Sequence, residues 1–98
     1  MKRYDFKNMG GIWEKEAREI TEKGVLIAHS GNWDLWEYGG TVYSIPVVGS
    51  GAGASVWCSL SGLRSHLYRL RQICGYNNLI PAGWENVNTD FLKGYGIA

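Results

Sequence analysis

Two short glycine-containing pairs in the middle of the chain constrain its fold most strongly. Gly31-Asn32 and Gly39-Gly40 separate runs rich in β-branched and aromatic residues. Both pairs suit the positive φ angles of two-residue hairpin turns. The runs cover residues 25–30, 33–38 and 41–47. The sequence therefore predicts a meander of three antiparallel strands.

Two-residue turns also predict the register of this meander. The expected cross-strand pairs are Ser30 with Trp33, His29 with Asp34, Ile27 with Trp36, and Trp36 with Tyr43. One face then carries the larger apolar set, which is Val25, Ile27, Trp36, Tyr38, Tyr43 and Ile45, with His29 and Asp34 at its end. The opposite face carries Leu26, Ala28, Trp33, Leu35, Glu37, Val42, Ser44 and Pro46. We expect helices to pack on the first face and Trp33 and Leu35 to lie on the outer one.

Helical patterns precede and follow the predicted strands along the chain. Over residues 11–23, Trp13, Ala17 and Ile20 recur at helical spacing, and opposite charges stand four residues apart. Gly24 can end this helix in the left-handed conformation. Residues 59–74 form the second helix, with an apolar stripe made of Leu60, Leu63, Leu67, Leu70 and Cys74. Ser59 or Ser61 can cap its start.

The remaining segments predict loops and a short terminal helix. Residues 48–55 alternate glycine with small residues, which favours a surface loop, because the lysine and spacing of a phosphate-binding loop are lacking. After Pro81, Asn88 can cap a helical turn that carries Phe91 and Leu92. Trp84, Phe91 and Tyr95 are expected to dock this tail on the body of the protein.

Composition indicates one domain over residues 1–98, with a core at 11–75 and a C-terminal extension at 76–98. A chain of 98 residues that is 45% hydrophobic supports one core. The charged start and the absence of a membrane-length apolar run predict neither a secretion signal nor a membrane span. Cys58 and Cys74 lack metal-site spacing, so we expect no metal or cofactor and two reduced thiols in a cytoplasmic protein.

Three motifs together resemble the HicA-type RNA-cleaving toxins. They are Asn32-Trp33-Asp34-Leu35-Trp36, the step Ile45-Pro46-Val47, and Gly62-Leu63-Arg64 followed by Leu67, Arg71-Gln72 and Gly75. The resemblance covers residues 24–75. It implies an α+β fold of helix, three-stranded antiparallel meander and helix, the arrangement that HicA toxins share with double-stranded-RNA-binding domains.

The departures from this family bear on catalysis and on RNA binding. Trp33 stands where the family has its catalytic His, and an indole cannot exchange a proton near neutral pH. We therefore expect no RNA cleavage by that route. Val56, Trp57 and Cys58 occupy the place of the lysines that hold phosphates in double-stranded-RNA-binding domains, which weakens duplex binding.

Candidate binding residues lie on the outer strand face and on the second helix. Trp33 and Trp57 could stack on unpaired bases or anchor a protein partner. Arg64, Tyr68 and Arg71 line up along one flank of the helix, in a region without any acid between residues 38 and 84. This row suits a phosphate backbone, an acidic protein surface, or a solvated helix face with no partner.

Candidate catalytic residues are His29, Asp34 and Cys58. His29 and Asp34 are predicted cross-strand neighbours, and a Cys58 thiol of lowered pKa near a helix start would complete a Cys-His-Asp hydrolase. The alternative is a hydrogen-bonded His29–Asp34 pair with a structural role, and for His66 a position on the helix flank without a task.

Three hypotheses of function follow. The leading one is a non-catalytic binding protein with a HicA-like fold, whose partner is RNA or a protein. The second is a small inhibitor from a phage or mobile element that blocks a host defence or nucleic-acid enzyme by protein contact. The third is a residual ribonuclease or Cys-dependent hydrolase.

Overall fold

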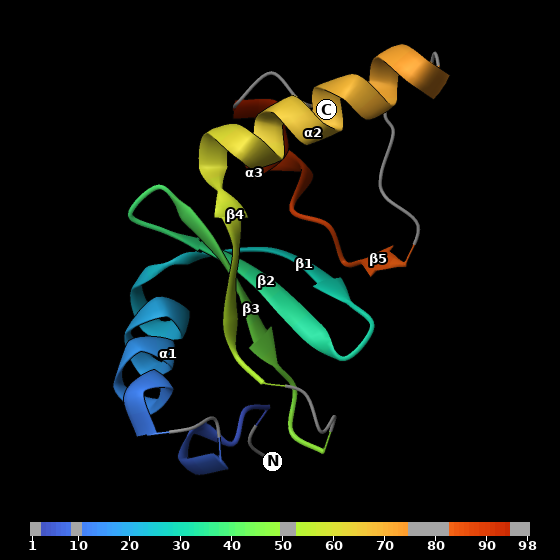
Figure 1. The fold of residues 1–98 in the computed structure, drawn as a ribbon. Coiled ribbons are helices and arrows are strands. Elements are labelled where there is room, and N and C mark those ends of the chain that lie inside the picture. Colours follow the sequence, from blue (N-terminus) through green and yellow to red (C-terminus); the bar gives the residue numbers. More distant parts are fainter. Residues whose placement is uncertain (1–2, 9–10, 50–52, 75–82, 95–98) are drawn as a thin grey trace.

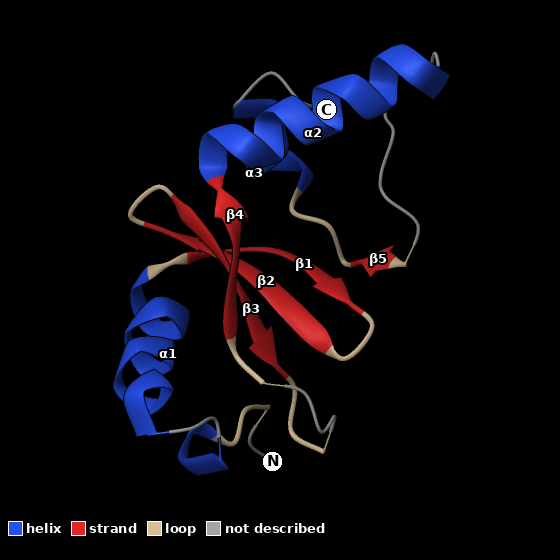
Figure 2. Cartoon of the chain, in the orientation of Figure 1, coloured by secondary structure: helices blue, strands red, loops and turns tan. Residues whose placement is uncertain are grey.

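An antiparallel sheet with helices on both of its sides forms the body of the protein, an α+β arrangement (Figures 1 and 2). The computed structural model describes residues 3–8, 11–49, 53–74 and 83–94. Its helices are η1 (Phe6–Asn8, a 3-10 turn), α1 (Gly11–Lys23), α2 (Leu60–Cys74) and α3 (Thr89–Gly94). Its strands are β1 (Val25–Ser30), β2 (Trp33–Tyr38), β3 (Thr41–Pro46), β4 (Ser55–Ser59) and β5 (Trp84–Glu85).

The predicted meander is confirmed, and it extends by one strand at each edge. The strand order is β4-β3-β2-β1-β5, and every neighbouring pair is antiparallel. The loop was predicted to run to Ser55, and no strand was predicted over Val56, Trp57 and Cys58, although Cys58 does lie near the start of α2. These residues form β4, because Val and Trp favour extended backbone and the edge of β3 is open to pairing.

The two hairpin turns form as the glycines predict. Gly31 has φ 60°, and Gly39 and Gly40 have φ 62° and 84°. These angles fit the tight turns that match the twist of a hairpin. The predicted pairs Ser30–Trp33, His29–Asp34 and Trp36–Tyr43 are confirmed.

One predicted pair is wrong because β1 contains a register shift. Leu26, and not Ile27, pairs with Trp36, and the register changes between Leu26 and Ala28. Ile27 is thereby an extra residue, and it lies with Ala28 in the core on the second sheet face. A similar shift between Val42 and Tyr43 places an extra residue, Trp57, in β4.

Both faces of the sheet are covered, which corrects the expectation of one outer face. On the first face, α1 and the N-terminal segment pack on Ile45 and on the aromatic residues Trp36, Tyr38 and Tyr43. On the second face, α2 and α3 cover Ile27, Ala28, Leu35 and Val42 through Leu63, Leu67 and Leu92. Leu35 is 3% exposed, because these helices shield it from water. Trp33 stays 42% exposed at the end of the same face.

The sheet is strongly curled. Trp57 and Trp84 lie on the two edge strands, four strand positions apart, yet their ring centroids are 5.9 Å apart. In a flat sheet the backbones of these two strands would lie roughly 19 Å apart, because neighbouring strands lie about 4.8 Å apart. The edges therefore bend toward each other over the second face, which makes that face concave.

The predicted helix caps are confirmed at two positions. The amide of Gly62 donates to Ser59 Oγ at 3.0 Å at the start of α2. The amide of Phe91 donates to Asn88 Oδ1 at 3.0 Å at the start of α3. Asn88 also donates through its side chain to the Leu26 carbonyl at 3.0 Å, which fixes the tail on β1. Trp84 and Phe91 pack on the core as expected, whereas Tyr95 lies outside the described residues.

Gly24 ends α1 for a different reason from the one predicted. It is not among the glycines with positive φ. A Cβ atom at this position would lie 2.5 Å from the Ile20 carbonyl oxygen and 2.6 Å from that of Glu37. Glycine is therefore required here by the close approach of β2 to the end of α1.

Replacing Gly24 with alanine is expected to lower the free energy of unfolding by about 1–3 kcal/mol, since backbone atoms must move to admit the methyl group. Urea denaturation of both proteins measures the change. Gly94→Ala is the matched control, because no atom lies within 4 Å of the added Cβ there. Equal stability of the two variants would contradict the close approach.

Candidate functional site

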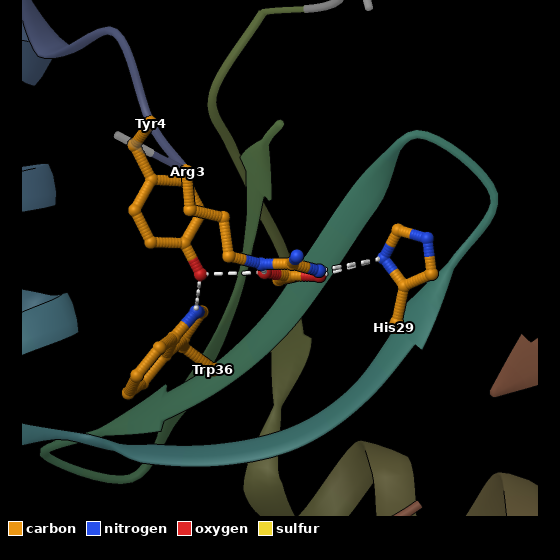
Figure 3. Close-up of polar contacts among 5 residues, drawn as sticks. Arg3, Tyr4, His29 and Trp36 are labelled. Atoms are coloured by element: carbon orange, nitrogen blue, oxygen red, sulfur yellow. Dashed lines mark hydrogen bonds and ion pairs between the residues drawn. The ribbon is translucent and has the colours of Figure 1, made fainter. Parts of the chain in front are cut away.

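A buried carboxylate organises the first sheet face. The Asp34 side chain is 0% exposed and stands at the start of β2. Arg3 donates to it through Nε at 2.5 Å and Nη2 at 2.8 Å, and Tyr4 donates its hydroxyl at 2.5 Å. His29 contacts it through Nδ1 at 2.7 Å. Trp36 Nε1 donates to the Tyr4 oxygen at 3.0 Å. We call Arg3, Tyr4, His29, Asp34 and Trp36 the Asp34 cluster (Figure 3).

The Asp34 cluster keeps the carboxylate ionised. Burial alone raises the pKa of Asp34, but the hydrogen bonds from Arg3, Tyr4 and His29 outweigh burial and hold that pKa below its usual value. The hydrogen bond to Asp34 raises the pKa of Arg3. Burial, followed by the bond to Asp34, raises the pKa of the Tyr4 hydroxyl. The N-terminal segment is thus tied to the sheet by a salt bridge and a neutral phenol.

His29 is oriented by this carboxylate. Because ionised Asp34 can only accept, the 2.7 Å contact requires the hydrogen on His29 Nδ1. Arg3 Nη2, at 3.3 Å from the same nitrogen, then makes a close contact and not a hydrogen bond. The second ring nitrogen points away from the cluster (Figure 3). The predicted His29–Asp34 pair at the sheet end is confirmed, with the geometry of an aspartate that orients a histidine.

The structure does not bring Cys58 to this pair. Cys58 packs against the core of the second face, while Asp34 and His29 lie on the first. Burial raises the pKa of the Cys58 thiol, although a backbone hydrogen bond from Leu63 opposes that effect. The prediction of a lowered pKa and a Cys-His-Asp triad is therefore wrong, because the Cys58 side chain packs against the core of the second face. Among the described residues, no serine, threonine or cysteine side chain hydrogen-bonds to His29.

An open pocket occupies the uncovered end of the second sheet face. Its volume is about 420 Å³, within the range of about 300–1,000 Å³ typical of small-ligand sites. It is lined by Ser30, Trp33, Leu35, Ser44, Gly53, Ser55 and Trp57, and we call it the indole pocket. Its described lining residues contribute three hydroxyl groups and no charged side chain.

The indole pocket depends on the twist and curl of the sheet. Trp33 stands at the start of β2, where Gly31 turns the hairpin, and Trp57 is the extra residue of β4. Trp84 packs against Trp57 with the ring planes at 56°, and this contact limits the movement of the Trp57 indole. The structure therefore brings together Trp33 and Trp57, two predicted binding residues from separate strands.

The predicted row on α2 is described only in part. Arg64 and Tyr68 are exposed on this helix, and Tyr68 is 57% exposed. Neither lines the indole pocket. The side chain of Arg71 lies outside the described part of the chain. His66 is exposed on α2, as predicted.

Arg3 and Tyr4 are the residues that sequence reasoning missed. The charged N-terminal segment has no periodicity that indicates a contact with residue 34. The available signal was Asp34 itself, an acid on a predicted apolar face, which requires a buried donor. Only the docking of the N-terminal segment identifies that donor as Arg3.

The described ranges contain neither a metal-binding cluster nor a membrane-spanning helix. No three His, Cys, Asp or Glu side chains within them gather to hold a metal ion. No helix in these ranges has the length and apolar character needed to cross a bilayer. Comparison of the chain with protein-family models, curated proteins and solved structures finds no match.

Proposed function

We propose that this chain is a non-catalytic RNA-binding protein that takes an unpaired base into the indole pocket. One observation carries the proposal, namely that two exposed indoles from different strands, Trp33 and Trp57, flank one concave site. Indoles stack on the flat faces of bases regardless of sequence. Leu35 offers an apolar floor. A base of single-stranded RNA is the ligand class that this geometry favours.

The hydroxyl groups of the pocket suit several bases. Ser30, Ser44 and Ser55 can each donate or accept a hydrogen bond. Both hydrogen-bond donors and hydrogen-bond acceptors on a base edge can therefore find a partner, so we expect weak preference for any one base. Stacking needs an unpaired base, which favours single strands over duplexes.

Phosphate contacts are assigned to α2 in this proposal. The helix begins at Leu60, three residues after Trp57, and Arg64 and Tyr68 are exposed on it. One or two phosphate contacts give a weak dependence on salt, about three- to sevenfold in affinity between 50 and 200 mM. The proposal includes a cytoplasmic location, where RNA is present.

A HicA-like origin of the fold is part of the same proposal. The order of α1, the meander and α2 supports it, and β4 is an addition between the meander and the second helix. Because Trp33 replaces the family's His, the chain would bind RNA without cleaving it.

The test is fluorescence titration of the protein with a single-stranded oligonucleotide and with the matching duplex. Trp33→Ala and Trp57→Ala are each expected to weaken single-strand binding about five- to hundredfold, because one base–aromatic stack contributes roughly 1–3 kcal/mol. Val56→Ala is the matched control, since Val56 is 56% exposed on β4 but does not line the pocket. Its affinity should stay within about twofold of the wild type.

Two outcomes would overturn the RNA proposal. One is single-strand binding that survives both tryptophan replacements, which would place the RNA elsewhere. The other is a chain that binds no RNA but forms a stable complex with a protein.

That second outcome would favour the inhibitor hypothesis, in which a phage or mobile-element protein blocks a nucleic-acid enzyme by protein contact. The observation on its side is the set of exposed large apolar side chains, Val25, Trp33, Val48, Val56, Trp57 and Tyr68.

A further inference from the structure

A second hollow lies between the N-terminal segment and α1, apart from the indole pocket. Its volume is about 370 Å³. The lining residues are Arg3, Tyr4, Asp5, Phe6, Lys7 and Arg18. Tyr4 and Phe6 belong to the aromatic packing of the first sheet face, whereas the indole pocket opens on the second. The two sites therefore share no residue.

The lining of this hollow is cationic. Three basic residues stand against one acid, Asp5, so the formal charge of the lining is 3 − 1 = +2. Arg3 directs its guanidinium to Asp34. Of the described lining residues, Lys7 and Arg18 are then the two cations that the hollow can offer to a ligand.

These two cations differ in how they are held. The Arg18 guanidinium carbon lies 4.7 Å from the centroid of the Phe6 ring, a cation–π contact that orients the planar group. Its contact with Glu14 is long, at 3.4 Å, and is exposed to solvent. Lys7 is exposed and has no hydrogen bond or ion pair with any described residue. A ligand would not have to break a strong existing pair to engage either residue.

We infer that this hollow is a binding site for a phosphate monoester. A fixed guanidinium matches two phosphate oxygens, and an ammonium group supplies a point charge to the third. The rings of Tyr4 and Phe6, whose centroids are 5.7 Å apart, offer an apolar wall for the organic part of the ligand. The phosphate can come from a free mononucleotide or from the end of an RNA strand. The inference does not depend on base binding in the indole pocket.

The test is NMR titration of the ¹⁵N-labelled protein with three probes, which are inorganic phosphate, a nucleoside 5′-monophosphate, and the matching nucleoside without phosphate. Phosphate and monophosphate are expected to shift the amide signals of residues 5–7 and 18, and the nucleoside to leave them unchanged. A paired oligonucleotide experiment, with and without a 5′-phosphate, separates the terminal phosphate of RNA from a free nucleotide as the source.

Lys7→Gln and Arg18→Gln are each expected to raise the dissociation constant for the monophosphate about tenfold, because each removes a charge-assisted hydrogen bond. Lys93→Gln is the matched control for the change in net charge, since Lys93 lies on α3 over the other sheet face. Its affinity should stay within about twofold of the wild type. Absence of phosphate-induced shifts, or equal weakening by all three variants, would overturn the inference. Trp33→Ala should not alter the monophosphate affinity, so the two proposed sites can fail independently.

Discussion

Replacing Arg3 with methionine is expected to lower the free energy of unfolding by about 2–3 kcal/mol. The substitution keeps an unbranched side chain of similar length but removes both donors to Asp34, which is 0% exposed. A buried carboxylate that loses its cation is among the costlier changes in a protein, about 3–5 kcal/mol when the pair is fully enclosed. Arg3 is half exposed, so we expect a loss below the range of a fully enclosed pair. Thermal denaturation should show a melting temperature reduced by roughly 10–20 °C.

The loss caused by Arg3→Met should depend on pH in a defined direction. The pKa of Asp34 is lower in the folded protein than in the unfolded chain, where it is about 3.9. Its contribution to stability is therefore complete above about pH 4 and is lost as the pH falls through the folded pKa. Removal of Arg3 raises that folded pKa. The difference in stability between wild type and variant should consequently be largest near neutral pH, and it should shrink as the pH falls from the raised pKa of Asp34 in the variant toward the lowered pKa in the wild type.

Arg69→Met provides the matched control for this experiment. Arg69 is exposed on α2, where its Nε approaches the Ser65 carbonyl oxygen at 3.5 Å. We expect a change within about 0.5 kcal/mol, as for surface substitutions in general. A stability loss for Arg3→Met that equals that of the control, or that stays constant from pH 7 to pH 3, would show that the Asp34 cluster does not anchor the N-terminal segment.

Replacing Leu35 with alanine is expected to lower the free energy of unfolding by about 2–5 kcal/mol. Leu35 is 3% exposed and belongs to the core under α2 and α3, so the shorter side chain leaves a cavity as well as losing buried apolar surface. Urea denaturation at neutral pH measures the change. The same substitution should weaken the proposed RNA binding, because Leu35 also lines the indole pocket.

The Leu35 experiment decides between the sequence-based expectation and the observed packing. On an outer sheet face, the replacement would cost less than about 0.5 kcal/mol. Val56→Ala serves as the comparison, since Val56 is 56% exposed on the edge strand. A small effect at both positions would contradict the docking of α2 and α3 on the second face.

Local sequence signals predicted the parts of the fold that depend on neighbouring residues. The glycine pairs identified both hairpins, and the register near the first turn followed from turn length, including the His29–Asp34 pair. Asn88 was identified as the cap of α3 from its side chain alone. These predictions are confirmed because the residues that form a turn or a helix cap lie within about four positions of one another.

Predictions failed where the backbone departs from regular alternation. Ile27 was assigned to the wrong face, since a register shift in β1 has no marker such as glycine or proline. The strand β4 was not predicted, because five residues of mixed polarity carry little periodic signal. Of the candidate site, the sequence identified Trp33 and Trp57 as exposed aromatics, but not that the curled sheet joins them in one pocket.

The sequence by itself determined the meander, the two main helices and the exposure of Trp33, because turn chemistry and apolar periodicity act over short distances. Tertiary structure alone decided three things, which are the union of Arg3 with Asp34, the meeting of Trp57 with Trp84, and the burial of Leu35. The first two contacts join residues at least 27 positions apart in the chain. The burial of Leu35 depends on helices α2 and α3, which are distant from it in the sequence. Such contacts arise from how layers pack and how far the sheet curls, and no local pattern encodes either property.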